Sequence, residues 1–343
     1  MSEDTQTLDL DAVGAYLSSH LPGFDGPLEA TKFQGGQSNP TFLLKTPTRN
    51  YVLRRKPPGV LLKSAHAVDR EYRVQKALAG SNVPVAQMHL LCEDDSVIGS
   101  AFYVMDHVAG RNFNDPTDGD LNPEQRGAVI DDMNRVLAEM HMVDIDAVGL
   151  SDYGPPGNYF ERQVGRWSKQ YKASETETIP AMDTLMQQLV ERMPKDDGQR
   201  TLVHGDYRID NMIFEADGTK CLAVLDWELS TIGHPFADLA SVIMQWQMPP
   251  GKEGRGLAGL DRGALGLPSD EAFIAKYCER RGLPGIDNFE FYLSFCFFRM
   301  AGIIQGVLKR ALDGNASNPE RARKVGQYVP VFAQRGLDVL NGG

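Results

Sequence analysis

Long apolar runs are missing from this sequence. No stretch approaches the roughly 18–20 consecutive apolar residues that cross a membrane. The first residues, Met-Ser-Glu-Asp-Thr, also lack the basic start and apolar segment of a secretion signal. We therefore expect a soluble cytoplasmic protein without a membrane partner, and 343 residues are enough to bury a sizeable core.

The sequence also contains few cysteines and has no net positive charge. The four cysteines are scattered, and none belongs to a Cys-x-x-Cys pair: Cys92, Cys221, Cys278 and Cys296. We expect buried free thiols at these positions, and neither disulfides nor a zinc site. The formal net charge is −11 at pH 7, whereas general nucleic-acid binding requires clustered Lys and Arg. Nucleic acid is therefore not an expected partner.

What the chain does contain is a polar stretch between short apolar segments. Residues 202–203 and 212–214 flank the sequence His-Gly-Asp-Tyr-Arg-Ile-Asp-Asn, and a third apolar run, 221–225, leads directly into Asp226. Asp206, Asn211 and Asp226 offer the hard oxygen atoms that suit Mg²⁺, whose coordination is completed by waters and substrate phosphates. The pattern predicts a site for a divalent cation and a phosphate.

Two other interpretations of this stretch are open from the residues alone. Gly and Asp are common turn residues, so His204, Gly205 and Asp206 are also compatible with a simple turn between strands. Asp206 and Asp226, completed by His204 or His234, would alternatively form a metal-dependent hydrolase site.

The spacing resembles a known family. His-Gly-Asp is followed by Asn five residues after the Asp, and by Asp fifteen residues after that Asn. This order is similar to the catalytic loop and metal-binding segment of the aminoglycoside phosphotransferase and choline kinase superfamily, which has a protein-kinase-like fold. The resemblance implies ATP and Mg²⁺ as cofactors, Asp206 as the base that accepts the hydroxyl proton, and Asn211 and Asp226 as magnesium ligands.

The same resemblance assigns the nucleotide side of the site. Gly35, Gly36 and Ser38 lie between the expected strands 28–33 and 41–45, where the superfamily has the loop that covers the nucleotide. Arg54, on the expected strand 51–55, stands where protein kinases have the phosphate-binding Lys, and Lys56 is the alternative. Glu71, on the expected helix 65–78, would pair with Arg54.

The implied fold is α+β and bilobal. Further strands are expected at 83–85 and 102–105, and the second leads through Met105 and His107 into a hinge that binds the adenine edge. We expect a small antiparallel β-rich, nucleotide-binding lobe over residues 1–107 and a larger, mainly helical catalytic and substrate-binding lobe over 108–343. Asp238 is expected to brace the catalytic segment, and His141 to be a core or cap residue.

The resemblance also implies that the acceptor is a small molecule with a hydroxyl group. Basic side chains outnumber acidic ones in the expected helix 159–171 and in the last helices, which does not suit a cationic acceptor. The runs at 52–59 and 203–211 look most like the kinase-like domains found alone in bacteria or fused to acyl-CoA dehydrogenases, which implies a hydroxyacyl-CoA. The alternatives are an aminoglycoside, choline or homoserine kinase, and a catalytically inactive nucleotide-binding scaffold.

Overall fold

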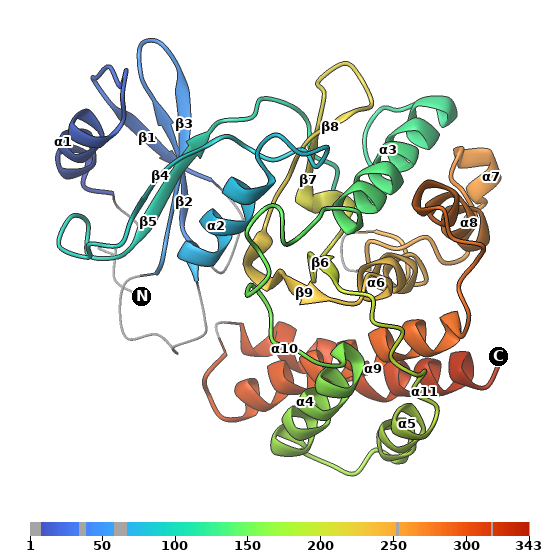
Figure 1. The fold of residues 1–343 in the computed structure, drawn as a ribbon. Coiled ribbons are helices and arrows are strands. Elements are labelled where there is room, and N and C mark those ends of the chain that lie inside the picture. Colours follow the sequence, from blue (N-terminus) through green and yellow to red (C-terminus); the bar gives the residue numbers. More distant parts are fainter. Residues whose placement is uncertain (1–7, 34–38, 58–66, 252–253, 317, 343) are drawn as a thin grey trace.

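The structure is a computed structural model that describes residues 8–33, 39–57, 67–251, 254–316 and 318–342. Figure 1 shows a small lobe built around one sheet and a larger lobe made mainly of helices. The α+β bilobal architecture expected from the sequence is confirmed.

The small lobe contains a five-stranded antiparallel sheet with the order β1-β2-β3-β5-β4. Its strands are β1 (Glu29–Lys32), β2 (Thr41–Lys45), β3 (Asn50–Arg55), β4 (Met88–Cys92) and β5 (Phe102–Asp106), accompanied by the helices α1 (Leu10–His20) and α2 (Val68–Leu78). The two helices cover opposite faces of this sheet. Leu53 packs in the cluster that contains Leu17 of α1, while Val52 packs in the cluster that contains Val68 of α2. Because strand side chains alternate, Arg54 points to the α2 face together with Val52.

One expected strand is wrong. Residues 83–85 are not a strand, and the strand in this region is β4, one of the two edge strands of the sheet, in which Met88, Leu90 and Cys92 are buried. Proline has no amide hydrogen to donate to a sheet. The carbonyl of Pro84 accepts a hydrogen bond from Val224 of the large lobe, so this segment connects the lobes.

The large lobe combines two short antiparallel ladders with a set of helices. The ladders pair β6 (Thr201–Val203) with β9 (Thr231–Gly233), and β7 (Met212–Phe214) with β8 (Cys221–Val224). The helices are α3 (Pro123–His141), α4 (Tyr159–Ser174), α5 (Pro180–Glu191), α6 (Phe236–Trp246), α7 (Arg262–Leu265), α8 (Asp270–Arg281), α9 (Phe289–Leu312), α10 (Pro319–Gly326) and α11 (Val329–Leu340). All four cysteines are buried and free, as expected.

Helix α9 forms the centre of the lower part of the large lobe (Figure 1). It is long and apolar enough to cross a membrane by length and composition alone, but 67% of its most apolar window is buried inside the structure. It packs against α4, α6, α10 and α11, as the core helix of a folded domain does.

The large-lobe core also includes Val74 and Leu78 of α2. Helix α2 therefore contacts both lobes, and the boundary after residue 107 stays a prediction.

Candidate active site

A buried carboxylate fixes the loop that follows β6. Asp238, in the first turn of α6, accepts hydrogen bonds from the backbone N–H of His204 at 2.6 Å and of Gly205 at 2.8 Å. Burial opposes ionisation of Asp238, but hydrogen bonds from the His141 ring and the His204 backbone hold its pKa below the usual range. The expected bracing role of Asp238 is confirmed, and so is the buried position of His141.

Gly205 makes the sharp turn that delivers Asp206. Its φ is +84°, and a Cβ atom at this position would lie 2.7 Å from the carbonyl oxygen of Leu229. Only glycine fits both the conformation and the space. The glycine in the sequence His-Gly-Asp is therefore required by the backbone.

Asn211 is held against Asp206. It lies in the short 3-10 helix η2 (Ile209–Asn211), and its Nδ2 donates to the backbone oxygen of Asp206 at 2.9 Å and to Asp206 Oδ2 at 3.1 Å. With the amide nitrogen used in this way, the amide oxygen is left as the group that can bind a cation.

Backbone hydrogen bonds bring Asp226 to the same place. The N–H of Leu225 donates to the carbonyl of Asn211 at 2.8 Å, and His204 Nε2 lies 2.9 Å from the carbonyl oxygen of Leu225. Asp226 itself has φ 63° and ψ 57°, a left-handed conformation that is costly for a residue other than glycine. Asp206, Asn211 and Asp226, separated by up to twenty residues in the sequence, thus converge through a shared network.

Arg54 joins the small lobe to this network. Its Nε lies 2.9 Å from Glu71 Oε2, and its second amino group (NH2) lies 2.8 Å from Asp226 Oδ1. The Glu71 side chain is only 1% exposed, and its carboxylate also accepts hydrogen bonds from Asn39 at 2.7 Å and Tyr103 at 3.1 Å. The predicted Arg54–Glu71 ion pair is confirmed, whereas Lys56 lies 3.7 Å from Asp69, away from this cluster.

The charges in this cluster influence one another strongly. Burial alone would lower the pKa of Arg54, but Glu71, Asp226 and Glu228 raise it, so the guanidinium is permanently charged. Burial raises the pKa of Glu71, and the neighbouring Arg54 opposes that effect. The guanidinium is therefore a fixed positive charge among the carboxylates of Glu71, Asp226 and Glu228.

The order of these parts along the chain is that of a known enzyme family. Residues 29–285 match the family described as the phosphotransferase enzyme family. The chain belongs to this family.

Several relatives are similar to this chain over almost its whole length. A crystal structure of a candidate aminoglycoside phosphotransferase from Ralstonia eutropha JMP134 is 49% identical with a TM-score of 0.90, covering 98% of this chain and 99% of that one. Acyl-CoA dehydrogenase family member 10 from mouse is 44% identical over 336 residues, which are 97% of this chain and 31% of the mouse protein. Human acyl-CoA dehydrogenase family member 11 is 42% identical over 340 residues, or 96% of this chain and 43% of the human protein. The chain spans less than half the length of these animal relatives.

More distant structures agree in fold. An aminoglycoside phosphotransferase in ternary complex with AMP-PNP and hygromycin B has a TM-score of 0.63 at 16% identity, covering 97% of this chain and 99% of that one. The expected superfamily, and within it the similarity to the domains associated with acyl-CoA dehydrogenases, are both confirmed.

The structure does not test the remaining predicted nucleotide-binding residues. Gly35, Gly36 and Ser38 lie outside the described residues. Met105 lies at the end of β5, and His107 follows where the chain leaves the sheet, with its N–H bonded to the carbonyl of Asn50 at 3.4 Å. The adenine-binding role of Met105 and His107 stays a prediction.

Three residues near the site were missed. Glu228 approaches Arg54 to 3.8 Å, the Nε of Arg208 lies 3.4 Å from Asp206 Oδ1, and Arg299 donates to the carbonyl of Gly205 at 2.9 Å. Glu228 and Arg208 each lie two positions after a predicted site residue, which is a usable signal. Arg299 comes from α9, and nothing in its local sequence connects it to this loop.

The hydrolase interpretation finds no support in the part of the chain that is described. His204 is engaged with the Leu225 carbonyl, and His234 lies 3.3 Å from Asp197. Among the described residues, no three His, Cys, Asp or Glu side chains gather as a metal site.

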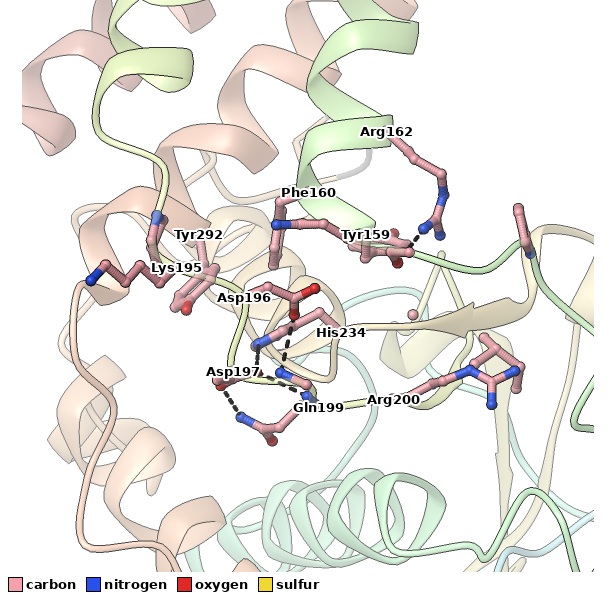
Figure 2. A pocket seen from close by; sticks show the side chains of 17 residues that line it. Tyr159, Phe160, Arg162, Lys195, Asp196, Asp197, Gln199, Arg200, His234 and Tyr292 are labelled. Atoms are coloured by element: carbon pink, nitrogen blue, oxygen red, sulfur yellow. Dashed lines mark hydrogen bonds and ion pairs between the residues drawn. The ribbon is translucent and has the colours of Figure 1, made fainter.

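A cavity of about 190 Å³ lies at the opposite end of the β6–β9 ladder from Asp206 (Figure 2). Arg200, Gly233 and His234 line it, and the 194–200 loop and the start of α4 complete it. Figure 2 shows the His234 ring directed toward Asp197 on this loop. Asp206, Asn211 and Asp226 are not among the described residues that line it, so the cavity is separate from the candidate active site.

Proposed function

We propose that this phosphotransferase moves the γ-phosphate of ATP to a hydroxyl group of a small molecule, and that the acceptor is a hydroxyacyl-CoA. The observation that carries the transfer reaction is the position of Arg54, which binds Glu71 in one lobe and Asp226 in the other, beside the Asp206–Asn211 pair. Each of these parts has a function in positioning and neutralising a transferred phosphoryl group.

Each side chain has a distinct task in this proposal. Asp206 accepts the proton of the attacking hydroxyl, since its carboxylate follows the fixed Gly205 turn and is oriented by Asn211. Arg54 binds phosphate oxygens through two parallel N–H groups and exchanges its contact with Asp226 for the nucleotide. Asn211 and Asp226 would hold Mg²⁺, which neutralises charge on the phosphates.

Related proteins support ATP as the phosphate donor. The neighbouring aminoglycoside phosphotransferase binds AMP-PNP, and a spectinomycin phosphotransferase with a TM-score of 0.62 binds ADP. Retention of the Arg54–Glu71 pair together with Asp206, Asn211 and Asp226 favours an active enzyme over an inactive nucleotide-binding scaffold.

The proposed acceptor is inferred from the names of related proteins and from the charge of the large-lobe helices. The mouse and human relatives are named as acyl-CoA dehydrogenases, and the matching region is only part of each. A hydroxyacyl-CoA would give a kinase domain and a dehydrogenase in one chain a common carrier. The basic residues on the large-lobe helices suit a carrier with several phosphates.

The test is ADP formation with Mg-ATP and a panel of hydroxyacyl-CoAs, aminoglycosides, choline and homoserine. We expect turnover on the acyl thioesters. Turnover only on a cationic acceptor would contradict the proposed acceptor and leave the transfer reaction standing. Mg-ATP binding with no turnover on any acceptor, and no slow ATP hydrolysis, would favour the scaffold.

A further inference from the structure

Two arginines from different helices lie over the ring of one tryptophan. The guanidinium carbon of Arg166, on α4, is 5.6 Å from the centre of the Trp167 ring, and that of Arg299, on α9, is 5.9 Å from it. Trp167 is buried, and Gly302 leaves room for its ring edge, since a Cβ there would lie 3.4 Å from it. We call Arg166 and Arg299 the arginine pair.

Arg299, the member of the pair on α9, lies beside the loop that carries Asp206. Arg299 donates a hydrogen bond to the carbonyl of Gly205, the residue directly before Asp206. Figure 1 shows α4 and α9 crossing below the β6–β9 ladder that carries this loop, and the two helices pack together. A molecule whose hydroxyl reaches Asp206 would therefore place its neighbouring groups near Arg299.

Neither arginine is neutralised by an acid. Within the described ranges, no Asp or Glu oxygen lies within 4 Å of the Arg166 or Arg299 guanidinium, whereas Lys172 on the same helix α4 is bound by Glu175 and Asp183. An aromatic face orients a guanidinium but does not satisfy its N–H donors. Arg299 thus holds an uncompensated positive charge beside the loop that carries Asp206, and Arg166 holds a second one against the same tryptophan ring. Each has donors in the fork geometry that fits a carboxylate or a phosphate.

We propose that the arginine pair binds an oxyanion of the acceptor, a carboxylate or a phosphate group, and thereby selects anionic acceptors. This inference rests on the proposed phosphotransfer but names the residues that read the acceptor. Arg299 is the inner member, since it contacts the loop, and Arg166 is the outer, exposed member. A cationic acceptor would meet the uncompensated positive charge of Arg299 near Asp206, with that of Arg166 farther out, and be repelled.

The variants Arg166→Met and Arg299→Met test the proposal, because Met keeps a long apolar side chain against Trp167 while removing the charge. Arg335→Met serves as the matched control, since Arg335 is exposed on α11 and hydrogen-bonded to Gln247, away from Trp167. Each protein is measured with a hydroxyacyl-CoA, with the same acyl chain as a pantetheine thioester that lacks phosphate, and with the free hydroxy acid.

We expect Arg166→Met to raise the KM of an anionic acceptor about tenfold, as the loss of one charged hydrogen bond implies, with kcat and the KM for ATP unchanged. Arg299→Met should raise KM further and also lower kcat, because it releases Gly205. An effect confined to the CoA ester identifies phosphate as the bound group, and an effect on the free acid identifies the carboxylate. Equal effects on all three acceptors, including the uncharged thioester, or no effect at all, would overturn the proposal.

Calorimetric binding of the hydroxyacyl-CoA in the presence of AMP-PNP separates this inference from the proposed function. If turnover is absent but binding is weakened in both variants and not in Arg335→Met, the arginine pair stands and the phosphotransfer fails. If the wild type does not bind the acyl-CoA or the free acid, or binds them equally well with Met at both positions, the arginine pair is overturned.

Discussion

Arg54 binds the buried carboxylate of Glu71 at 2.9 Å, which ties β3 to α2. The Glu71 side chain is 1% exposed and that of Arg54 is 13% exposed. Removing one member of such a pair leaves an uncompensated buried charge, which costs far more than the pair itself contributes. The stability of the small lobe and the proposed binding of phosphate thus depend on the same arginine.

Arg54→Met should lower the free energy of unfolding by about 3–5 kcal/mol, because Glu71 loses its partner. The double variant Arg54→Met/Glu71→Gln should recover most of this loss. Arg49→Met is the matched control, because the Arg49–Asp106 pair is on the surface of the same sheet and such pairs contribute about 1 kcal/mol or less. Urea unfolding measures the stability of the three variants. If Arg54→Met were no less stable than the Arg49→Met control, the Arg54–Glu71 pair would not be electrostatically important.

Gly205→Ala should destabilise the fold by about 1–3 kcal/mol and reduce turnover, since alanine is strained at φ +84° and its methyl group would collide with the Leu229 carbonyl. Gly165→Ala provides the opposite case. Gly165 is inside helix α4, where a Cβ meets nothing within 4 Å, so alanine should stabilise by about 0.5–1 kcal/mol. Thermal unfolding and initial rates compare the two variants, and equal behaviour would contradict the turn geometry.

Stability should fall as the pH drops below about 6.5, the ordinary pKa of histidine. Burial lowers the pKa of His141, although Asp238 opposes this, and burial likewise lowers the pKa of His234. In this pH range the unfolded chain therefore binds more protons than the folded chain. The contribution of the two neutral histidines to the free energy of unfolding is complete above their unfolded pKa and is lost as the pH falls below it. Asp238, with a lowered pKa, loses its contribution only below the ordinary Asp range.

This pH dependence can be assigned with His141→Gln. Between pH 7.5 and 5.5, the variant should lose less stability than the wild type, by up to about 1.4 kcal/mol per pH unit for one proton. Urea unfolding at a series of pH values gives the slope. The same slope in both proteins would mean that His141 is not responsible.

The fold was largely predictable because its signals are local. Asn122 directly before Pro123 is the sequence pattern of a helix start, and in the structure Asn122 caps α3 through Gln125. The misplaced strand at 83–85 shows the limit of this approach. A short apolar segment with a proline looked like a strand, while the true strand β4 carries its signal in the alternation of Met88, Leu90 and Cys92.

The active site was predictable only where its parts are ordered along one segment or matched to a family. Asp206, Asn211 and Asp226 fall within one such segment, and Glu71 was found by its order relative to Arg54. The direct Arg54–Asp226 contact joins residues 172 positions apart, and the Arg299–Gly205 contact joins residues 94 apart. These pairs depend on how the lobes and α9 pack, which local periodicity does not specify.

The most direct test of the proposed phosphotransfer is a comparison of Asp206→Asn with the wild type, measuring kcat on the hydroxyacyl-CoA and the Kd of Mg-ATP. Asparagine keeps the shape and can still bond to Asn211, but it cannot accept the hydroxyl proton. We predict that kcat falls by about 10²–10⁴-fold while the Kd of Mg-ATP changes little. Unchanged turnover in Asp206→Asn would contradict the assignment of Asp206 as the base and, with it, the proposed reaction.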